Sequence, residues 1–197
     1  MEKSLVHKVL IAGTGRTGTS FLMAVLHDVG INIGFSDEEV LHTATRKSKA
    51  GLELEIGFIY DYIEMTNETP YIVKCPRYSH MIKSISEKCI IDHVYIPIRE
   101  MEDVVKSRVS KKRNSGGLWG ARDGNSQRVF LYKILGCLIH DLILLDIPYT
   151  FVKFDKMISD PKYCYNKFNF ILNGISKKSF IISFNKMNKL FKGNVKL

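Results

Sequence analysis

The sequence predicts one α/β domain, in which a parallel sheet lies between two layers of helices. The chain has 197 residues, of which 45% are hydrophobic, and this is enough for one domain with a substantial core. Short apolar runs alternate with longer segments of helical periodicity, as in a parallel sheet covered on both faces. A glycine-rich turn follows the first apolar run, a position that suits anion binding. We expect a single three-layer domain over residues 1–197.

The strands are predicted from short apolar runs that end at glycine, proline or a charged residue. They cover residues 9–12, 71–73, 93–96 and 149–154. The first run is continuously apolar, as in a parallel strand that is buried on both faces. Residues 30–35 fit either a loop or a further strand.

Helices are predicted between these strands. They cover residues 19–29, 78–88, 101–109, 129–145 and 161–172. Residues 51–66 also carry apolar side chains at helical intervals. The polar, glycine-rich residues 111–126 are predicted to form a mobile loop, and the Lys- and Asn-rich residues 174–197 a solvated tail.

The charge balance leaves three kinds of partner open. There are 29 Lys and Arg against 20 Asp and Glu, so the net charge is +9. This excess argues against an acidic or largely disordered chain. It fits nucleic acid, a membrane surface or a phosphorylated small molecule equally well.

The four cysteines predict buried free thiols in a reducing compartment, and we expect a cytoplasmic protein. They are Cys75, Cys89, Cys137 and Cys164. They form no C-x-x-C pair and have no matching His cluster, so no metal site is expected. No secretory signal is recognisable, and charged residues and Pro148 interrupt the longest apolar stretch, residues 134–152.

The strongest local signal is the run Gly13-Thr-Gly-Arg-Thr-Gly-Thr-Ser20, between a predicted strand and a predicted helix. Successive backbone N–H groups and the helix N-terminus make such a loop an anion site. Two motifs overlap in it. The run matches the G-x-G-x-x-G dinucleotide fingerprint, and it is also a Walker A loop in which Thr19 replaces the lysine.

The first motif leaves an NAD(P)-dependent oxidoreductase as an alternative. Asp37 and Glu38 stand about 20 residues after the loop, where an acidic side chain would bind the ribose hydroxyls. Residues 30–36 would then form the strand that leads to them. A kinase or ATPase is disfavoured, because the phosphate-binding lysine is missing and no acidic, metal-holding strand end follows.

The second motif resembles the phosphosulfate loop of the sulfotransferase superfamily, in which the basic residue stands earlier. Arg16-Thr-Gly-Thr-Ser-Phe21 is similar to the family's Lys/Arg-Ser-Gly-Thr-Thr segment with a following aromatic or aliphatic residue. Val94-Tyr-Ile-Pro-Ile-Arg99, with Ser107 eight positions later, is similar to the family's 3′-phosphate site. Residues 71–76 and 151–161 fit more loosely. The resemblance covers about residues 8–172 and implies a P-loop-like fold of the sulfotransferase type.

The resemblance implies transfer of a sulfuryl group from 3′-phosphoadenosine 5′-phosphosulfate to a hydroxyl or amine acceptor, such as a carbohydrate or another metabolite. The residues implied to hold the 5′ end of this donor are Gly15, Arg16, Thr17, Gly18, Thr19 and Ser20. Arg99 and Ser107 are implied to bind the 3′-phosphate. A ligand with anionic groups at two ends needs two separate anion sites, and an arginine beside a hydroxyl suits the second.

Two roles in the chemistry are expected. Lys74, at a predicted strand end, is expected beside Arg16 as the second cation near the reacting oxygens. A general base must take the acceptor's proton, and the resemblance favours Glu38 or Glu39 after the first helix. The same residues fit a helix start, in which Ser36 is the cap and Glu39 completes a capping box. The rival candidates are Asp37, Glu53, Glu55 and His80.

A basic nucleic-acid-binding module is the third alternative. Residues 106–113 are densely basic and run into the loop that holds Trp119 and Arg122. The patch has no interleaved aromatic residues and no nucleic-acid motif accompanies it. Under the sulfotransferase interpretation these residues would cover the nucleotide and meet the acceptor.

Overall fold

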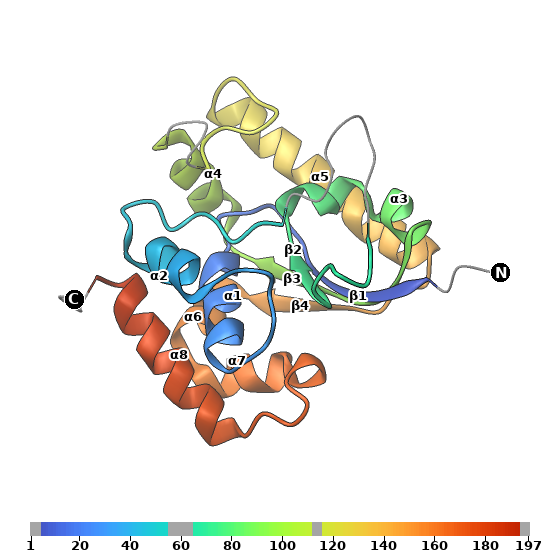
Figure 1. The fold of residues 1–197 in the computed structure, drawn as a ribbon. Helices are drawn as coiled ribbons and strands as arrows, with labels where there is room; N and C mark the ends of the chain where they lie inside the picture. Colours follow the sequence, from blue (N-terminus) through green and yellow to red (C-terminus); the bar gives the residue numbers. More distant parts are fainter. Residues whose placement is uncertain (1–4, 55–64, 112–115, 194–197) are drawn as a thin grey trace.

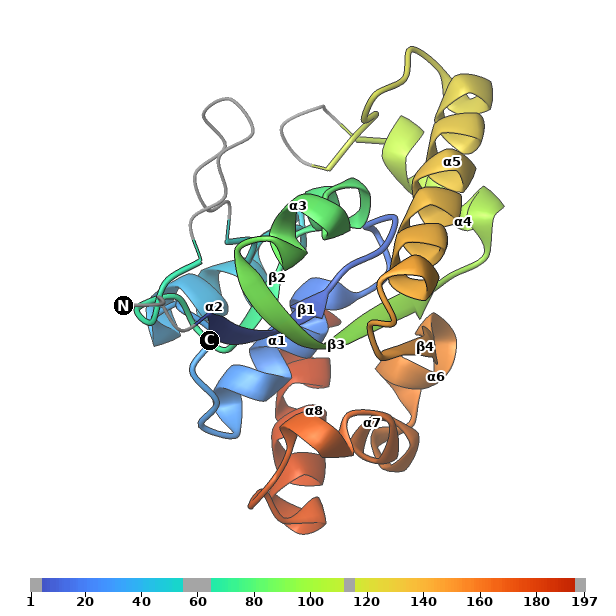
Figure 2. The ribbon, with the colours of Figure 1, turned by 90° about the vertical axis from the view of Figure 1, so that its right-hand side faces the viewer.

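The sheet has the strand order β2-β1-β3-β4, and the pairs of neighbouring strands are all parallel. The structure is a computed structural model that describes residues 5–54, 65–111 and 116–193. The strands are β1 (Val6–Ile11), β2 (Ile72–Lys74), β3 (Cys89–Ile98) and β4 (Tyr149–Lys153). Helices lie on both faces of this sheet (Figures 1 and 2), so the predicted three-layer α/β architecture is confirmed.

Each face of the sheet packs against its own set of helices. One face meets α1 (Thr19–Asp28), α6 (Phe154–Ser159), α7 (Pro161–Lys167) and α8 (Lys177–Phe191). The other face meets η1 (Pro76–His80), α3 (Ile82–Ser86) and α5 (Gly124–Leu144). Side chains of β1 alternate between these two cores, with Val9 and Ile11 in the first and Leu10 in the second. The shorter elements are α2 (Asp37–Thr45), α4 (Met101–Val109) and η3 (Asn169–Ile171).

The carboxyl ends of the four strands meet at one edge of the sheet. Ile11, at the end of β1, is in register with Lys74 of β2 and Tyr95 of β3. The glycine loop after β1 therefore lies near the residues that follow the other strands. In open parallel sheets this edge is where ligands bind.

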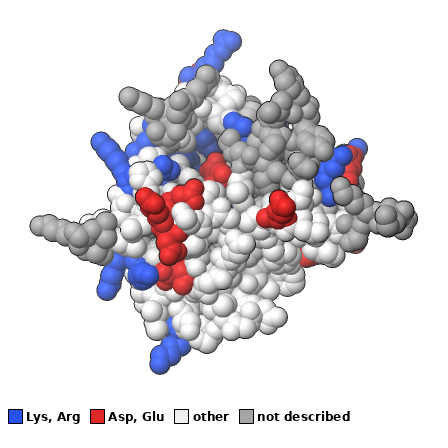
Figure 3. Space-filling view, in the orientation of Figure 1, with Lys and Arg blue, Asp and Glu red and all other residues white. Residues whose placement is uncertain are grey.

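The helix α2 begins with three acidic residues and a complete capping box. Ser36 Oγ accepts a hydrogen bond from Glu39 N, and Glu39 Oε2 accepts one from Ser36 N at 2.8 Å. Figure 3 shows acidic side chains gathered on this face in the region of α2. The capping box expected from the sequence is confirmed, and it accounts for Glu39 structurally.

Several predicted boundaries were wrong for local reasons. Residues 30–35, for which a loop and a strand were both left open, form a loop, because Gly30 and Gly34 turn the chain with φ values of 90° and 79°. The helix predicted over 78–88 is divided into η1 and α3 at Met81, whose φ is −129°. The helix predicted from residue 129 begins at Gly124, because Asp123 caps it. Of the helix expected over 51–66, residues 51–54 and 65–66 are not helical, and 55–64 lie outside the described residues.

Two further expectations are corrected by burial. Cys75, Cys89 and Cys164 are buried as predicted, whereas Cys137 is exposed on α5. The expected solvated tail folds as α8 over residues 177–191 and buries Phe180 and Phe184 almost completely. The Lys and Asn residues between these aromatic positions hide a helical spacing that would have indicated an amphipathic helix. No helix among the described residues is long and apolar enough to cross a bilayer.

We expect Phe184→Ala to lower the free energy of unfolding by about 3–5 kcal/mol, measured by urea denaturation. The Phe184 side chain is 1% exposed and its ring centroid lies 5.1 Å from that of Phe21 in α1. Ile182→Ala is the matched control on the same helix, because Ile182 is 60% exposed and should change stability by less than about 0.5 kcal/mol. Equal effects of both substitutions would contradict the docking of α8 in the core.

Candidate functional site

The loop after β1 has a backbone that glycine makes possible. Gly15 and Gly18 have φ values of 68° and 75°, in the left-handed region. A side chain at position 15 would also collide with Arg108, because a Cβ there would lie 2.7 Å from Arg108 Nη2. Gly18 is the N-cap of α1, and no side chain caps this helix. The first backbone N–H groups of α1 are therefore available at the loop as hydrogen-bond donors for an anion.

Arg16 occupies a left-handed backbone conformation without being a glycine, with a φ of 58°. Arg99, directly after β3, and Ser107, in α4, hold it there. Arg16 Nε donates to Ser107 Oγ at 3.0 Å, and Arg99 Nη1 donates to the Arg16 carbonyl oxygen at 3.3 Å. Burial lowers the pKa of Arg16, and the nearby Arg99 cation lowers it further. The structure thus brings together the loop arginine, Arg99 and Ser107, which the sequence had singled out.

Arg99 lies at the end of β3 with part of its guanidinium unpaired. The Arg99 guanidinium packs on the ring of Phe154, with 4.6 Å between the guanidinium carbon and the ring centroid. Arg99 Nη2 lies 3.7 Å from Asp103 Oδ2, and the Asp103 side chain is 52% exposed. Arg99 Nε is buried and has no hydrogen-bond partner. The group is therefore held in place and has a donor left for a ligand.

Lys74 is buried at the end of β2, with 1% of its surface exposed. Its Nζ donates to Ser20 Oγ at 3.2 Å, to the Gly51 carbonyl oxygen at 2.6 Å and to Glu53 Oε1 at 3.1 Å. Burial lowers the pKa of Lys74, and the Glu53 carboxylate opposes this by favouring the cation. Lys74 is not among the residues that line the cavity described next; it lies behind Ser20 and Glu53, which do line it.

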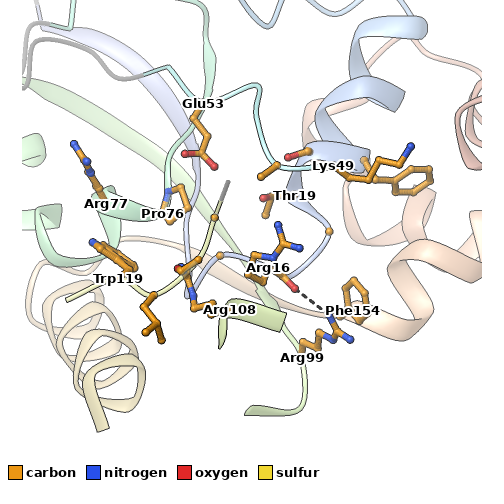
Figure 4. Close-up of a pocket in the computed structure, with 18 of the residues that line it drawn as sticks. Arg16, Thr19, Lys49, Glu53, Pro76, Arg77, Arg99, Arg108, Trp119 and Phe154 are labelled. Carbon is orange, nitrogen blue, oxygen red and sulfur yellow. Dashed lines mark hydrogen bonds between the residues drawn. The ribbon is translucent and has the colours of Figure 1, made fainter. Parts of the chain in front are cut away.

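A cavity of about 680 Å³ opens over the loop (Figure 4). Its described lining includes five basic side chains, those of Arg16, Lys49, Arg77, Arg99 and Arg108. Glu53 is the one carboxylate among the described residues that line the cavity, and Figure 4 shows it directed into the cavity. The aromatic lining residues are Phe21, Trp119, Phe154 and Phe191. The volume suits a nucleotide-sized ligand, and the surplus of cations suits an anionic one.

The acidic residues favoured as general bases are elsewhere. Glu39 is committed to its capping box, whose hydrogen bonds from Ser36 lower the pKa of its carboxyl. Asp37 Oδ1 pairs with His27 Nε2 at 2.6 Å. Neither of these residues nor Glu38 lines the cavity. Glu55 lies outside the described residues, so of the carboxylate candidates the structure brings Glu53 to the site.

His80 is beside the cavity without lining it. Its ring centroid lies 5.7 Å from that of Trp119. Burial lowers the pKa of His80, and the Arg77 cation adds to this effect. No group of three or more His, Cys, Asp or Glu side chains that could hold a metal ion lies within residues 5–54, 65–111 and 116–193.

Sequence reasoning missed several contributors to the cavity, among them Lys49, Arg77, Phe154 and Phe191. Arg108 was grouped with the densely basic residues 106–113 and was given no role of its own, yet it is 5% exposed and lines the cavity. Met101, Val104 and Val105 are buried on the same helix at spacings that place Arg108 on the same face, so this pattern could have found it. Phe191 was missed because α8 itself was not predicted.

The structure is an α/β domain with a glycine-rich loop and a basic cavity at the carboxyl edge of its parallel sheet. No protein-family model and no curated protein sequence matches the chain. Among solved structures, the chain is similar to the sulfotransferase domain from the curacin biosynthetic pathway. The two share 12% sequence identity with a TM-score of 0.55, over 92% of this chain and 78% of that chain. The chain therefore has the sulfotransferase fold, which confirms the predicted fold type.

Proposed function

We propose that this chain transfers a sulfuryl group from 3′-phosphoadenosine 5′-phosphosulfate to a hydroxyl or amine acceptor. One observation supports this most directly. Among the described residues, the buried side-chain nitrogen and oxygen atoms without a partner are Thr17 Oγ1, Arg99 Nε and Arg108 Nε. Thr17 belongs to the loop, and both arginines line the cavity above it. Unpaired buried polar atoms cost free energy, so their gathering at one place favours a bound anion there.

The cations are arranged for a ligand with two anionic ends. Arg16 and the N–H groups at the start of α1 would hold the 5′-phosphosulfate, and Arg99 at the end of β3 would hold the 3′-phosphate. The bound donor would supply the sulfuryl group on a phosphosulfate anhydride. Such a transfer depends on positioning and on neutralising the oxygens of the transferred group. Fixed arginines in a partly buried cavity meet both needs.

We propose Glu53 as the group that takes the acceptor's proton. Its carboxylate lines the cavity and is 32% exposed, so an acceptor hydroxyl can reach it. Lys74 pairs with Glu53 and also donates to Ser20 at the start of α1. Lys74 would therefore orient both Glu53, which is assigned to the acceptor, and Ser20, which is assigned to the donor, without lining the cavity itself.

The dinucleotide alternative loses its structural support. In that fold the acidic ribose ligand ends the second strand, close to the loop. Here residues 30–35 form no strand, and the strand next to β1 on that side is β2, which ends in Lys74. Asp37 and Glu38 stand on α2 and do not line the cavity.

A thermal shift measurement tests the proposed function. We expect saturating adenosine 3′,5′-bisphosphate to raise the melting temperature by about 5–10 °C, since a ligand at about 100 times its Kd stabilises by roughly 2.7 kcal/mol. NAD, NADP and ATP should leave it unchanged. Stabilisation by NADP alone would contradict the proposal. A screen of acceptor classes with labelled donor then identifies the acceptor.

A further inference from the structure

We propose that Arg108 is a positioning residue, which holds residues 116–120, with Trp119, against the donor loop. The donor loop and residues 116–120 are two walls of the cavity, and both would then shift together when an anion binds at the loop. The inference rests on the proposed function for its ligand probe, although part of its test needs no ligand.

Arg108 joins the two walls through one rigid group. Its Nη2 donates to the carbonyl oxygen of Thr14 in the loop at 2.6 Å, and its Nη1 donates to that of Gly117 at 2.8 Å. Gly15 makes room for this contact, because a Cβ there would lie 2.7 Å from Nη2. The planar guanidinium fixes the angle between the two hydrogen bonds, so a shift of either wall strains the other.

Trp119 is held from a second direction by α5. Gln127 is fully buried; its Oε1 accepts from Trp119 N at 2.7 Å, and its Nε2 donates to Trp119 O at 3.0 Å. The indole ring packs edge-on against Phe130, with centroids 5.3 Å apart. The Arg108 guanidinium carbon lies 5.4 Å from the indole centroid, and Figure 4 shows Arg108 between Trp119 and Arg16. Gln127 thus fixes the segment to α5, and Arg108 fixes it to the loop.

The charge of Arg108 makes this link sensitive to an anion. Burial, together with the neighbouring Arg16 cation, lowers the pKa of Arg108 to about 10. Its two carbonyl partners are neutral, and its Nε has no partner. The Glu53 carboxylate offsets only part of the cost of burying this cation, so an anion at the loop would stabilise Arg108 where it lies. That gain is the physical basis of coupling between the loop and the Trp119 wall.

The first test uses the protein without ligand. Trp119 is the only tryptophan of the chain, so its emission reports on this wall alone. Arg108→Lys keeps the charge but cannot hold two carbonyls as a fork. We expect acrylamide quenching of Trp119 to rise at least about twofold, because the freed carbonyls recruit water. Arg128→Lys is the matched control: Arg128 is on α5, pairs with Glu102 and does not line the cavity. Equal quenching in all three proteins would overturn the proposal.

The second test adds adenosine 3′,5′-bisphosphate. In the unmodified protein, Trp119 emission should change with the same midpoint as calorimetric binding. In Arg108→Lys, we expect affinity to fall by no more than about tenfold while the emission response is lost. Arg128→Lys should keep both. A full response in Arg108→Lys, or binding to the unmodified protein without any response, would overturn the proposal.

The outcomes separate this inference from the proposed function. Absence of calorimetric binding to the unmodified protein would contradict the proposed function, and the quenching comparison would still decide the role of Arg108. If circular dichroism shows that Arg108→Lys does not fold, Arg108→Gln replaces it in the quenching test. The emission response of the unmodified protein also supports or overturns the coupling independently of any variant.

Discussion

We expect Arg99→Ala to weaken the binding of adenosine 3′,5′-bisphosphate by about 10- to 100-fold, the loss expected when one charge-assisted hydrogen-bond partner is removed. The binding of 5′-AMP, which lacks the 3′-phosphate, should change much less. The reason is geometric: Arg99 donates to the Arg16 carbonyl through Nη1 and lies 3.7 Å from Asp103 through Nη2, while its Nε has no partner among the described residues and is left for a second anion. Isothermal calorimetry with the two nucleotides measures the difference.

Arg128→Ala is the control for a general loss of positive charge. Arg128 lies outside the cavity lining and pairs with Glu102, so both nucleotides should bind as before. If Arg99→Ala instead weakens both nucleotides equally, Arg99 is not the 3′-phosphate contact. Its role would then be to support the backbone of Arg16.

We expect Glu53→Gln to lower turnover by about 100-fold or more, which is the usual contribution of a general base. The affinity for adenosine 3′,5′-bisphosphate should stay largely intact, because Glu53 is assigned to the acceptor. Turnover is measured with labelled donor and calorimetry gives the affinity. The melting temperature is followed in parallel, since Lys74 loses its carboxylate partner in this variant.

Glu38→Gln and Glu39→Gln are the matched controls, one helix away. Gln can replace Glu in a capping box, so Glu39→Gln tests the carboxylate without removing the cap. Neither residue lines the cavity, and we expect turnover within about twofold of the unmodified protein. A loss in either variant as large as that in Glu53→Gln would return the role of base to α2.

The fold was predictable where local patterns are strong. The helix α4 was predicted with its observed limits, because acidic residues begin it and basic residues end it. The glycine loop and the strand before it were predicted from the spacing of the glycines and the continuous apolar run that precedes them. The order of the strands in the sheet was not, since nothing in a single sequence states which strands pair. The helix α8 was not predicted, because its many Lys and Asn residues conceal the helical spacing of its buried side chains.

The sequence predicted residues of the proposed anion-binding half that the structure brings together. Arg16, Arg99 and Ser107 follow strand ends or lie one helix further on, and parallel strands bring such positions to one edge. The acceptor half was not predicted, because its expected acidic residues satisfy a strong local pattern at the start of α2. Glu53 follows the left-handed Leu52, with a φ of 56°, in a segment without regular structure. The position of the Glu53 side chain depends on its pairing with buried Lys74, twenty-one residues later, which a local sequence pattern does not reveal.

The cavity draws its lining from Gly15 to Phe191, so it depends on residues that are far apart in the sequence. Phe191 belongs to the last helix, and its ring centroid lies 5.5 Å from that of Phe21 behind the loop. Removal of α8 would take away Phe191 but would leave in place the loop after β1 and the basic residues that line the cavity. The shape of the cavity therefore depends on α8, whereas its positive charge comes from other elements.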